Sequence, residues 1–146
     1  MDAQSLRRSL PRQLAAISVV IALALVSGAC GADIPRGKVI FSTDVPKADG
    51  VCSPGNAVTD IADKTSVYAT YVFKDRPGSE TLSLSVTKDG ASYIPSSDLP
   101  TTDTSGLDCF ADTTDLSTLP NWGPGTYHIS VMNGSTVVTE GDLTVK

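Results

Sequence analysis

The sequence predicts an antiparallel β-sandwich that follows a short apolar N-terminal segment. Several segments after residue 37 alternate apolar and polar residues with the period of two that is typical of half-buried strands. Asp-Gly and Asn-Gly dipeptides between them mark tight hairpins. The chain is also rich in Thr, Ser, Asp and Gly, a composition that favours strands and turns over helices.

The N-terminus has the parts of a secretory signal peptide. Residues 1–13 carry three arginines and one acid, residues 14–26 carry no charge, and small residues follow. The stretch "SGAC" resembles the lipobox of bacterial lipoproteins, although Ser27 stands where Leu is usual. The resemblance implies that the sulfur of Cys30 receives diacylglycerol and that a signal peptidase cuts just before Cys30. Two or more acyl chains then anchor the mature protein firmly to a membrane.

The expected organisation is therefore a helical signal peptide over residues 1–29, a lipidated cysteine with a tether over 30–37, and one β-domain over 38–146. An uncleaved helix is the alternative, since residues 14–32 carry no charge and could just span a bilayer core of ~30 Å. Both alternatives place the domain outside the cytoplasm, because the arginines stay inside. We expect a lipid-anchored protein on the extracytoplasmic face of the cell membrane.

The first predicted strands lie in the first half of the domain. Residues 38–43 form a candidate strand. Residues 66–73 alternate so that one face carries Val67, Ala69, Tyr71 and Phe73. Residues 81–87 place Leu82, Leu84 and Val86 on one face and Ser83, Ser85 and Thr87 on a wet outer face. A hairpin at Asp89-Gly90 then leads into a return strand, residues 91–94, which Pro95 should stop.

The last predicted strands form a hairpin at the C-terminal end. Residues 126–132 place Tyr127, Ile129 and Val131 on one face, and Asn133-Gly134 predicts the turn. Residues 135–146 return as a long strand. Gly141 inside that strand predicts a bulge, after which Leu143 and Val145 should face the core.

Residues 125–127, Gly-Thr-Tyr, resemble the Gly-x-Tyr that opens strand F of immunoglobulin-like domains and forms their tyrosine corner. The resemblance implies an immunoglobulin-like (Greek-key) sandwich. Gly123 and Ile129 stand where that family has Asp and Cys, so the inter-sheet disulfide of antibody domains is not expected. The stretch "WGPGTY" with the final "LTV" also resembles domains of bacterial surface lipoproteins of unknown function. We expect Trp122 to plug the end of the core, the alternative being an exposed platform that stacks on sugars.

Cys52 and Cys109 remain once Cys30 is assigned to lipid. An even pair of cysteines in an oxidising compartment predicts a disulfide, here one that joins two turn-rich segments. A redox or metal pair is the alternative. The absence of C-x-x-C spacing and the presence of a single histidine argue against it.

Net charge limits the partners that the protein can have. The chain has a net charge of −5, and removal of residues 1–29 takes away three basic residues and one acid, which leaves −7. An acidic protein repels phosphate backbones, so we expect no nucleic-acid partner. The membrane contact is therefore expected to come from the lipid anchor.

Residues with catalytic potential are few. His128 lies between two core-facing residues of its strand, so it should point to solvent without a catalytic partner. Residues 97–120 contain five aspartates, and carboxylates could bind Ca²⁺. Their spacing does not fit an EF-hand loop, so we expect solvated turn residues, no metal site and no cofactor. The five are Asp98, Asp103, Asp108, Asp112 and Asp115.

These observations predict a cell-envelope binding or accessory module that is not an enzyme. An envelope protein or a glycan is the expected kind of partner. Two alternatives stay open: a passive structural subunit of a membrane complex, and a metal-dependent enzyme that uses the aspartate-rich loop.

Overall fold

A computed structural model describes residues 34–47, 52–99 and 104–146. The predicted signal peptide (residues 1–29), Cys30 and Asp103 lie outside these ranges. None of the described residues forms a helix with the length and hydropathy of a membrane span.

The described part of the chain is an all-β domain, as predicted, with one short 3₁₀ helix. Its sheet has the strand order β6-β5-β8-β9-β1-β4-β7, while β2 pairs with β1 and β3 pairs with β9. The elements are β1 (Lys38–Ser42), β2 (Ala57–Val58), β3 (Asp60–Ile61), β4 (Tyr68–Val72), β5 (Leu82–Lys88), β6 (Ala91–Leu99), β7 (Cys109–Ala111), η1 (Leu116–Thr118), β8 (Gly125–Asn133) and β9 (Thr136–Val145).

The prediction of a wholly antiparallel arrangement was wrong. Strands β1 and β3 both run parallel to β9, through the pairs Lys38–Glu140 and Asp60–Thr144 among others. The remaining pairings are antiparallel. The sheet is therefore mixed, because β9 pairs in parallel with strands from the start of the domain, which no hairpin joins to it.

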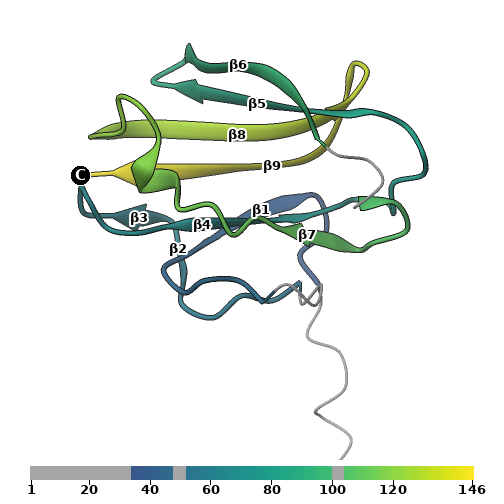
Figure 1. Cartoon of the computed structure of the whole chain (residues 1–146), viewed down its shortest axis with the longest axis horizontal. Coiled ribbons are helices and arrows are strands. Elements are labelled where there is room, and N and C mark those ends of the chain that lie inside the picture. Colours follow the sequence, from purple (N-terminus) through teal and green to yellow (C-terminus); the bar gives the residue numbers. More distant parts are fainter. Residues whose placement is uncertain (1–33, 48–51, 100–103) are drawn as a thin grey trace, which may run out of the picture. The chain divides into compact units, whose positions relative to one another are not determined.

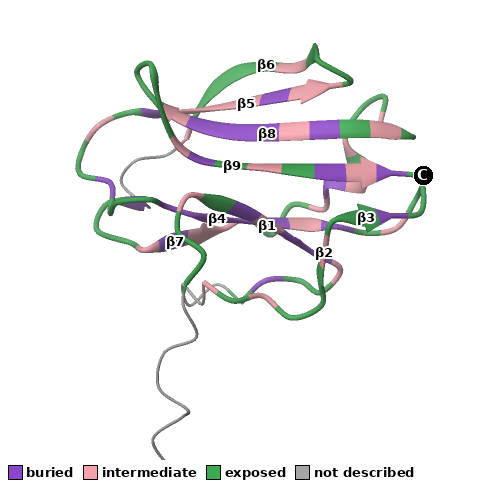
Figure 2. Ribbon diagram, turned by 180° about the vertical axis from the view of Figure 1, so that it is seen from behind, coloured by how far each residue is buried: buried purple, intermediate pink, exposed green. Residues whose placement is uncertain are grey.

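The sheet curls so that β6, β5, β8 and β9 form one layer and β1, β4 and β7 form the other (Figure 1). The hydrophobic core fills the space between these two layers. Strands β4 and β8 are largely buried, whereas the edge strand β6 is mostly exposed (Figure 2). Burial of large side chains such as Tyr71, Phe73 and Tyr127, each at most 1% exposed, stabilises this curl.

Strand β4 confirms the predicted alternation and adds to it. The predicted inner face is buried at all four positions, from Val67 to Phe73. Thr70 and Val72 on the opposite face are also fully buried. A strand buried on both faces lies deeper in the domain than its sequence indicated.

The hairpin between β5 and β6 confirms the Asp89-Gly90 turn. Both residues have positive φ, 52° and 80°, as a type I′ turn requires. The prediction that Pro95 stops the return strand was wrong, because β6 continues to Leu99. Leu84 pairs with Ser97 and Val86 with Ile94, so β6 bulges around Pro95. Proline is tolerated there because β6 is an edge strand and a bulge needs no ladder N–H.

The hairpin between β8 and β9 is also confirmed, but its turn lies one residue later than predicted. Asn133 pairs with Thr136, so Gly134 and Ser135 form the loop, and Gly134 has a φ of 59°. A type II′ turn requires a positive φ at the first of its two central residues, and glycine adopts this conformation readily. The inner face of β8 is buried as predicted, with Tyr127, Ile129 and Val131 at most 3% exposed.

Gly141 does not mark the bulge of β9, and that prediction was wrong. The bulge lies at Val138, because Val131 pairs with Thr139 while Met132 pairs with Val137. Gly141 instead lies where β1 approaches β9: a Cβ there would meet the Val39 carbonyl oxygen at 2.7 Å. Glycine permits this approach of two backbones. Leu143 and Val145 beyond it are buried in the core, as predicted.

Candidate functional site

A cavity of about 90 Å³ lies between the two layers, beside the segment of residues 112–122. We call it the aromatic pocket. Most of its lining is apolar or aromatic and comes from β4, β5, β6, β8 and that segment. The lining residues are Tyr71, Leu84, Val86, Tyr93, Ile94, Asp112, Thr114, Leu116, Leu119, Trp122, Tyr127 and Ile129.

Backbone hydrogen bonds hold the 112–122 segment against β4. The Asp112 N–H donates to the Ala69 carbonyl at 2.9 Å, and the Leu116 N–H donates to the Val67 carbonyl at 2.8 Å. The side chain of Leu116 is buried in the core. The segment is therefore part of the folded domain and forms one wall of the pocket.

Three aromatic side chains make another wall of the aromatic pocket. The rings of Trp122 and Tyr127 stack with centroids 4.3 Å apart, and Tyr93 meets Tyr127 edge-on at 5.1 Å. The Tyr93 hydroxyl donates to the Pro120 carbonyl at 2.6 Å and so ties β6 to the segment. Trp122 packs on the core, as predicted, because its ring stacks on the buried ring of Tyr127.

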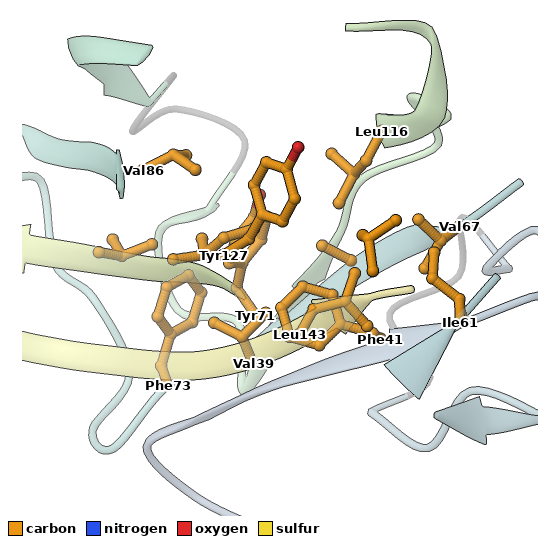
Figure 3. Close-up of a cluster of buried hydrophobic side chains, with 14 of the residues drawn as sticks. Val39, Phe41, Ile61, Val67, Tyr71, Phe73, Val86, Leu116, Tyr127 and Leu143 are labelled. Atoms are coloured by element: carbon orange, nitrogen blue, oxygen red, sulfur yellow. The ribbon is translucent and has the colours of Figure 1, made fainter. Parts of the chain in front are cut away.

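The hydroxyl of Tyr71 is the notable polar group of the aromatic pocket. Tyr71 is only 1% exposed, and its ring stacks on that of Phe110 with the centroids 6.1 Å apart. Burial and then the negative charge of Asp112 raise the pKa of Tyr71 well above its usual value. The hydroxyl therefore keeps its proton at neutral pH and remains a hydrogen-bond donor. Figure 3 shows Tyr71 and Tyr127 between Val86 and Leu116.

Trp122 carries a buried polar group without a partner among the described residues. Its indole Nε1 is buried and forms no hydrogen bond with any described residue. Buried donors in folded proteins are nearly always bonded, so each exception calls for an explanation. Among the described residues with such an atom, Trp122 is the one that lines the aromatic pocket.

The four described aspartates of residues 97–120 do not form a single cluster that could hold a metal ion. Asp98 lies on the edge strand β6, and Asp112 accepts from the Thr114 N–H at 2.8 Å. Asp115 caps η1 and accepts from the N–H groups of Ser117 and Val67. Burial acts to raise the pKa of Asp115, but hydrogen bonds from Ser66, Ser117 and Val67 outweigh it and lower that pKa. Within residues 34–47, 52–99 and 104–146, no three His, Cys, Asp or Glu side chains are placed to hold a metal ion.

Asp108 binds two arginines that the sequence analysis did not single out. Its carboxylate accepts from Arg76 at 2.8 Å and 3.1 Å and from Arg36 at 2.9 Å. The hydrogen bond from Arg76, together with that from Arg36, lowers the pKa of Asp108 to about 2. Arg36, expected in the tether, is thereby bonded to the domain.

The predicted disulfide is present and joins Cys52 to Cys109, with their Cα atoms 5.4 Å apart. The expectation that both cysteines lie in turn-rich segments holds only for Cys52, because Cys109 is the first residue of β7 and is 1% exposed. The bridge therefore fixes the 52–58 region to an edge strand of the sheet rather than joining two loops.

His128 faces away from the core, as predicted, and its side chain is 40% exposed. Its Nδ1 lies 2.8 Å from Oδ1 of Asp142, its cross-strand partner, and its Nε2 lies 3.7 Å from Oε2 of Glu140. Two carboxylates beside one exposed histidine form a surface charge cluster on the outer face of the sheet.

The aromatic pocket has no counterpart among the features that the sequence predicts. Tyr71 belongs to an inner face whose other members are ordinary core residues, and Tyr93 belongs to a strand that was expected to end one residue later. Neither position carries a signal that separates the lining of a cavity from a filled core. No protein-family model, curated protein or solved structure matches the chain.

Proposed function

We propose that this protein is a lipid-anchored binding module on the extracytoplasmic face of a cell membrane. The Cys52–Cys109 disulfide carries the proposal, because such bridges persist in oxidising compartments. The basic, apolar and small-residue pattern of residues 1–30 supports export and lipidation at Cys30. Disulfide and lipobox are independent features, and both favour the same side of the membrane.

Binding, rather than catalysis, is the activity that the pocket supports. Its lining is mostly aromatic and aliphatic, and a binding site typically combines such walls with a few polar groups. Asp112 is the one charged residue in that lining. The ligand or partner comes from the cell envelope, where the anchor holds the domain.

We also propose that the domain is an immunoglobulin-like Greek-key sandwich. The Tyr127 hydroxyl donates to the Gly123 carbonyl at 2.8 Å and accepts from the Gly123 N–H at 3.1 Å. A tyrosine that bonds back to the backbone a few residues upstream is the defining contact of a tyrosine corner. The two layers of the curled sheet agree with a sandwich, while the parallel pairings of β9 depart from the antibody pattern.

Substitution of Cys30 tests the anchor. We expect Cys30→Ser to leave the precursor without lipid, so that the protein moves from the detergent phase to the aqueous phase in a phase-partitioning assay. Cys52→Ser is the matched control, since it removes a cysteine elsewhere and should leave the protein in the detergent phase. If Cys30→Ser and the unmodified protein partition alike, the N-terminus is an uncleaved spanning helix and the lipoprotein proposal fails.

A further inference from the structure

We propose that one end of the domain rests on the phosphate groups of the membrane lipids that surround its anchor, as a second contact beside the lipid on Cys30. This inference rests on the anchor of the proposed function and adds the orientation of the domain. It is drawn from the few residues between Cys30 and the domain, and from the side chains where the chain enters the domain. We call these side chains the tether-side surface: Ile34, Arg36, Arg76, Leu107 and Asp108.

The tether is too short to let this end of the domain move far from the membrane. The Arg36 N–H donates to the Ile34 carbonyl at 2.8 Å, and the Gly37 N–H donates to the Val72 carbonyl of β4 at 2.9 Å. The chain is therefore bonded to the domain from Ile34 onward, and Ile34 follows Cys30 by four residues. A fully extended chain of four residues spans at most about 14 Å. A lipidated Cys30 keeps Ile34 within that distance.

Side chains from two other segments meet the chain at this end. The Asp108 carboxylate accepts from Arg36 at 2.9 Å and from Arg76 at 2.8 Å. Leu107 precedes Asp108 and is 38% exposed, while Ile34 is 40% exposed. They are two of the four large hydrophobic side chains that are exposed among the described residues. The tether-side surface thus combines apolar and basic side chains where the chain enters the domain.

This combination suits the headgroup layer of a phospholipid membrane. A guanidinium group has five N–H donors, and Asp108 occupies one donor of Arg36 and two of Arg76. The other donors can bind phosphate oxygens, which match the planar fork of arginine. Exposed aliphatic side chains such as Ile34 and Leu107 are stabilised when they enter the boundary between headgroups and acyl chains.

Short-range contacts, rather than a general attraction of charge, hold this surface on the lipid. Asp75 and Glu80 lie with Arg76 in the segment between β4 and β5, and the chain is acidic as a whole. A long-range attraction to anionic lipid is therefore not expected. The anchor makes the contact intramolecular, so individually weak contacts suffice once Cys30 is held in the bilayer. The phosphate group of a zwitterionic phospholipid is enough for them.

The opposite end of the domain points away from the lipid. Ala62 is exposed and follows β3, whose Ile61 pairs with Val145 of β9. Val145 lies five residues along β9 from Glu140, whose N–H donates to the Gly37 carbonyl, a separation of about 17 Å. Figure 1 shows β3 and the C-terminus on the opposite side from β7, which begins just after the tether-side surface. Ala62 is therefore a reference position far from the proposed contact.

Fluorescence quenching in vesicles tests this orientation. Leu107→Trp and Ala62→Trp, each combined with Trp122→Phe, give chains with a single indole at one end or the other. The lipidated proteins are reconstituted into phosphatidylcholine vesicles whose acyl chains are brominated near the headgroup, because bromine quenches indole fluorescence on contact. We expect Leu107→Trp to lose most of its emission relative to vesicles without bromine, and Ala62→Trp to lose none. Both chains share the Trp122→Phe background, so any defect of that substitution affects them alike.

A charge substitution tests the contact with phosphate. In the Leu107→Trp chain, Arg76→Gln should restore part of the lost emission, because fewer donors hold this end on the lipid while Asp108 keeps its bond from Arg36. Lys64→Gln removes an exposed basic residue close to Ala62 and is the matched control. It should leave the quenching unchanged.

Equal quenching of Leu107→Trp and Ala62→Trp would overturn the proposal, and so would an Arg76→Gln chain that is quenched as fully as its parent. If the indole introduced by Leu107→Trp is unquenched in these vesicles but shielded from aqueous iodide in host membranes, a protein covers this end instead of lipid. Flotation with the vesicles checks the anchor separately. A chain that floats without quenching refutes the contact alone, whereas a chain that does not float refutes the anchor and the contact together.

Discussion

Replacement of Cys52 by alanine is expected to lower the free energy of unfolding by about 4 kcal/mol under oxidising conditions. The disulfide links residues separated by 57 positions, and closure of a loop of that length in the unfolded chain has an entropic effect of about this size. Urea unfolding monitored by Trp122 fluorescence measures the change. Such a loss is a large fraction of the stability of an ordinary domain.

Two controls isolate the effect of the bridge. Ser53→Ala alters an exposed neighbour of Cys52 and should leave stability unchanged. With a strong reductant present, the unmodified protein and Cys52→Ala should unfold at nearly the same urea concentration. A Cys52→Ala variant as stable as the unmodified protein under oxidising conditions would show that the bridge contributes nothing to the fold.

Gly141→Ala is expected to destabilise the domain by about 1–3 kcal/mol, the usual range for overpacking a well-packed site. The added Cβ would lie 2.7 Å from the Val39 carbonyl oxygen and 2.9 Å from the Val39 Cβ, so β1 would have to move away from β9. This junction joins the two layers of the sheet through the Lys38–Glu140 pair. Thermal or urea unfolding measures the loss.

Gly123→Ala is the matched control for that substitution. A Cβ at Gly123 meets nothing within 4 Å, and the hydrogen bonds of Gly123 with Tyr127 use backbone atoms that alanine retains. We expect a change of less than about 0.5 kcal/mol. Equal stability of Gly141→Ala and Gly123→Ala would contradict the close approach of β1 and β9.

The sequence predicted the features that depend on neighbouring residues. Alternation located β4, β5 and β8, because a two-residue period directly reports which face is buried. Asp89-Gly90 and Asn133-Gly134 located two hairpins, since glycine is needed where φ is positive. Counting cysteines predicted the disulfide once Cys30 was assigned to lipid.

Features that depend on distant parts of the chain could not be predicted in the same way. Gly141 was interpreted as a bulge because a strand glycine signals either a bulge or a close backbone approach, and only the position of Val39 decides between them. Pro95 was expected to end a strand because nothing in the sequence shows that β6 is an edge. The pocket depends on residues from four strands and one segment, which no local pattern relates.

The intact mass of the protein purified from membranes of its own host tests most directly whether it is a lipid-anchored extracytoplasmic protein. The expected species begins at Cys30, carries diacylglycerol and is two hydrogens lighter than its dithiol form, as the Cys52–Cys109 bridge requires. A species that keeps residues 1–29, has no lipid on Cys30 and has free thiols at Cys52 and Cys109 would contradict both the anchor and the compartment.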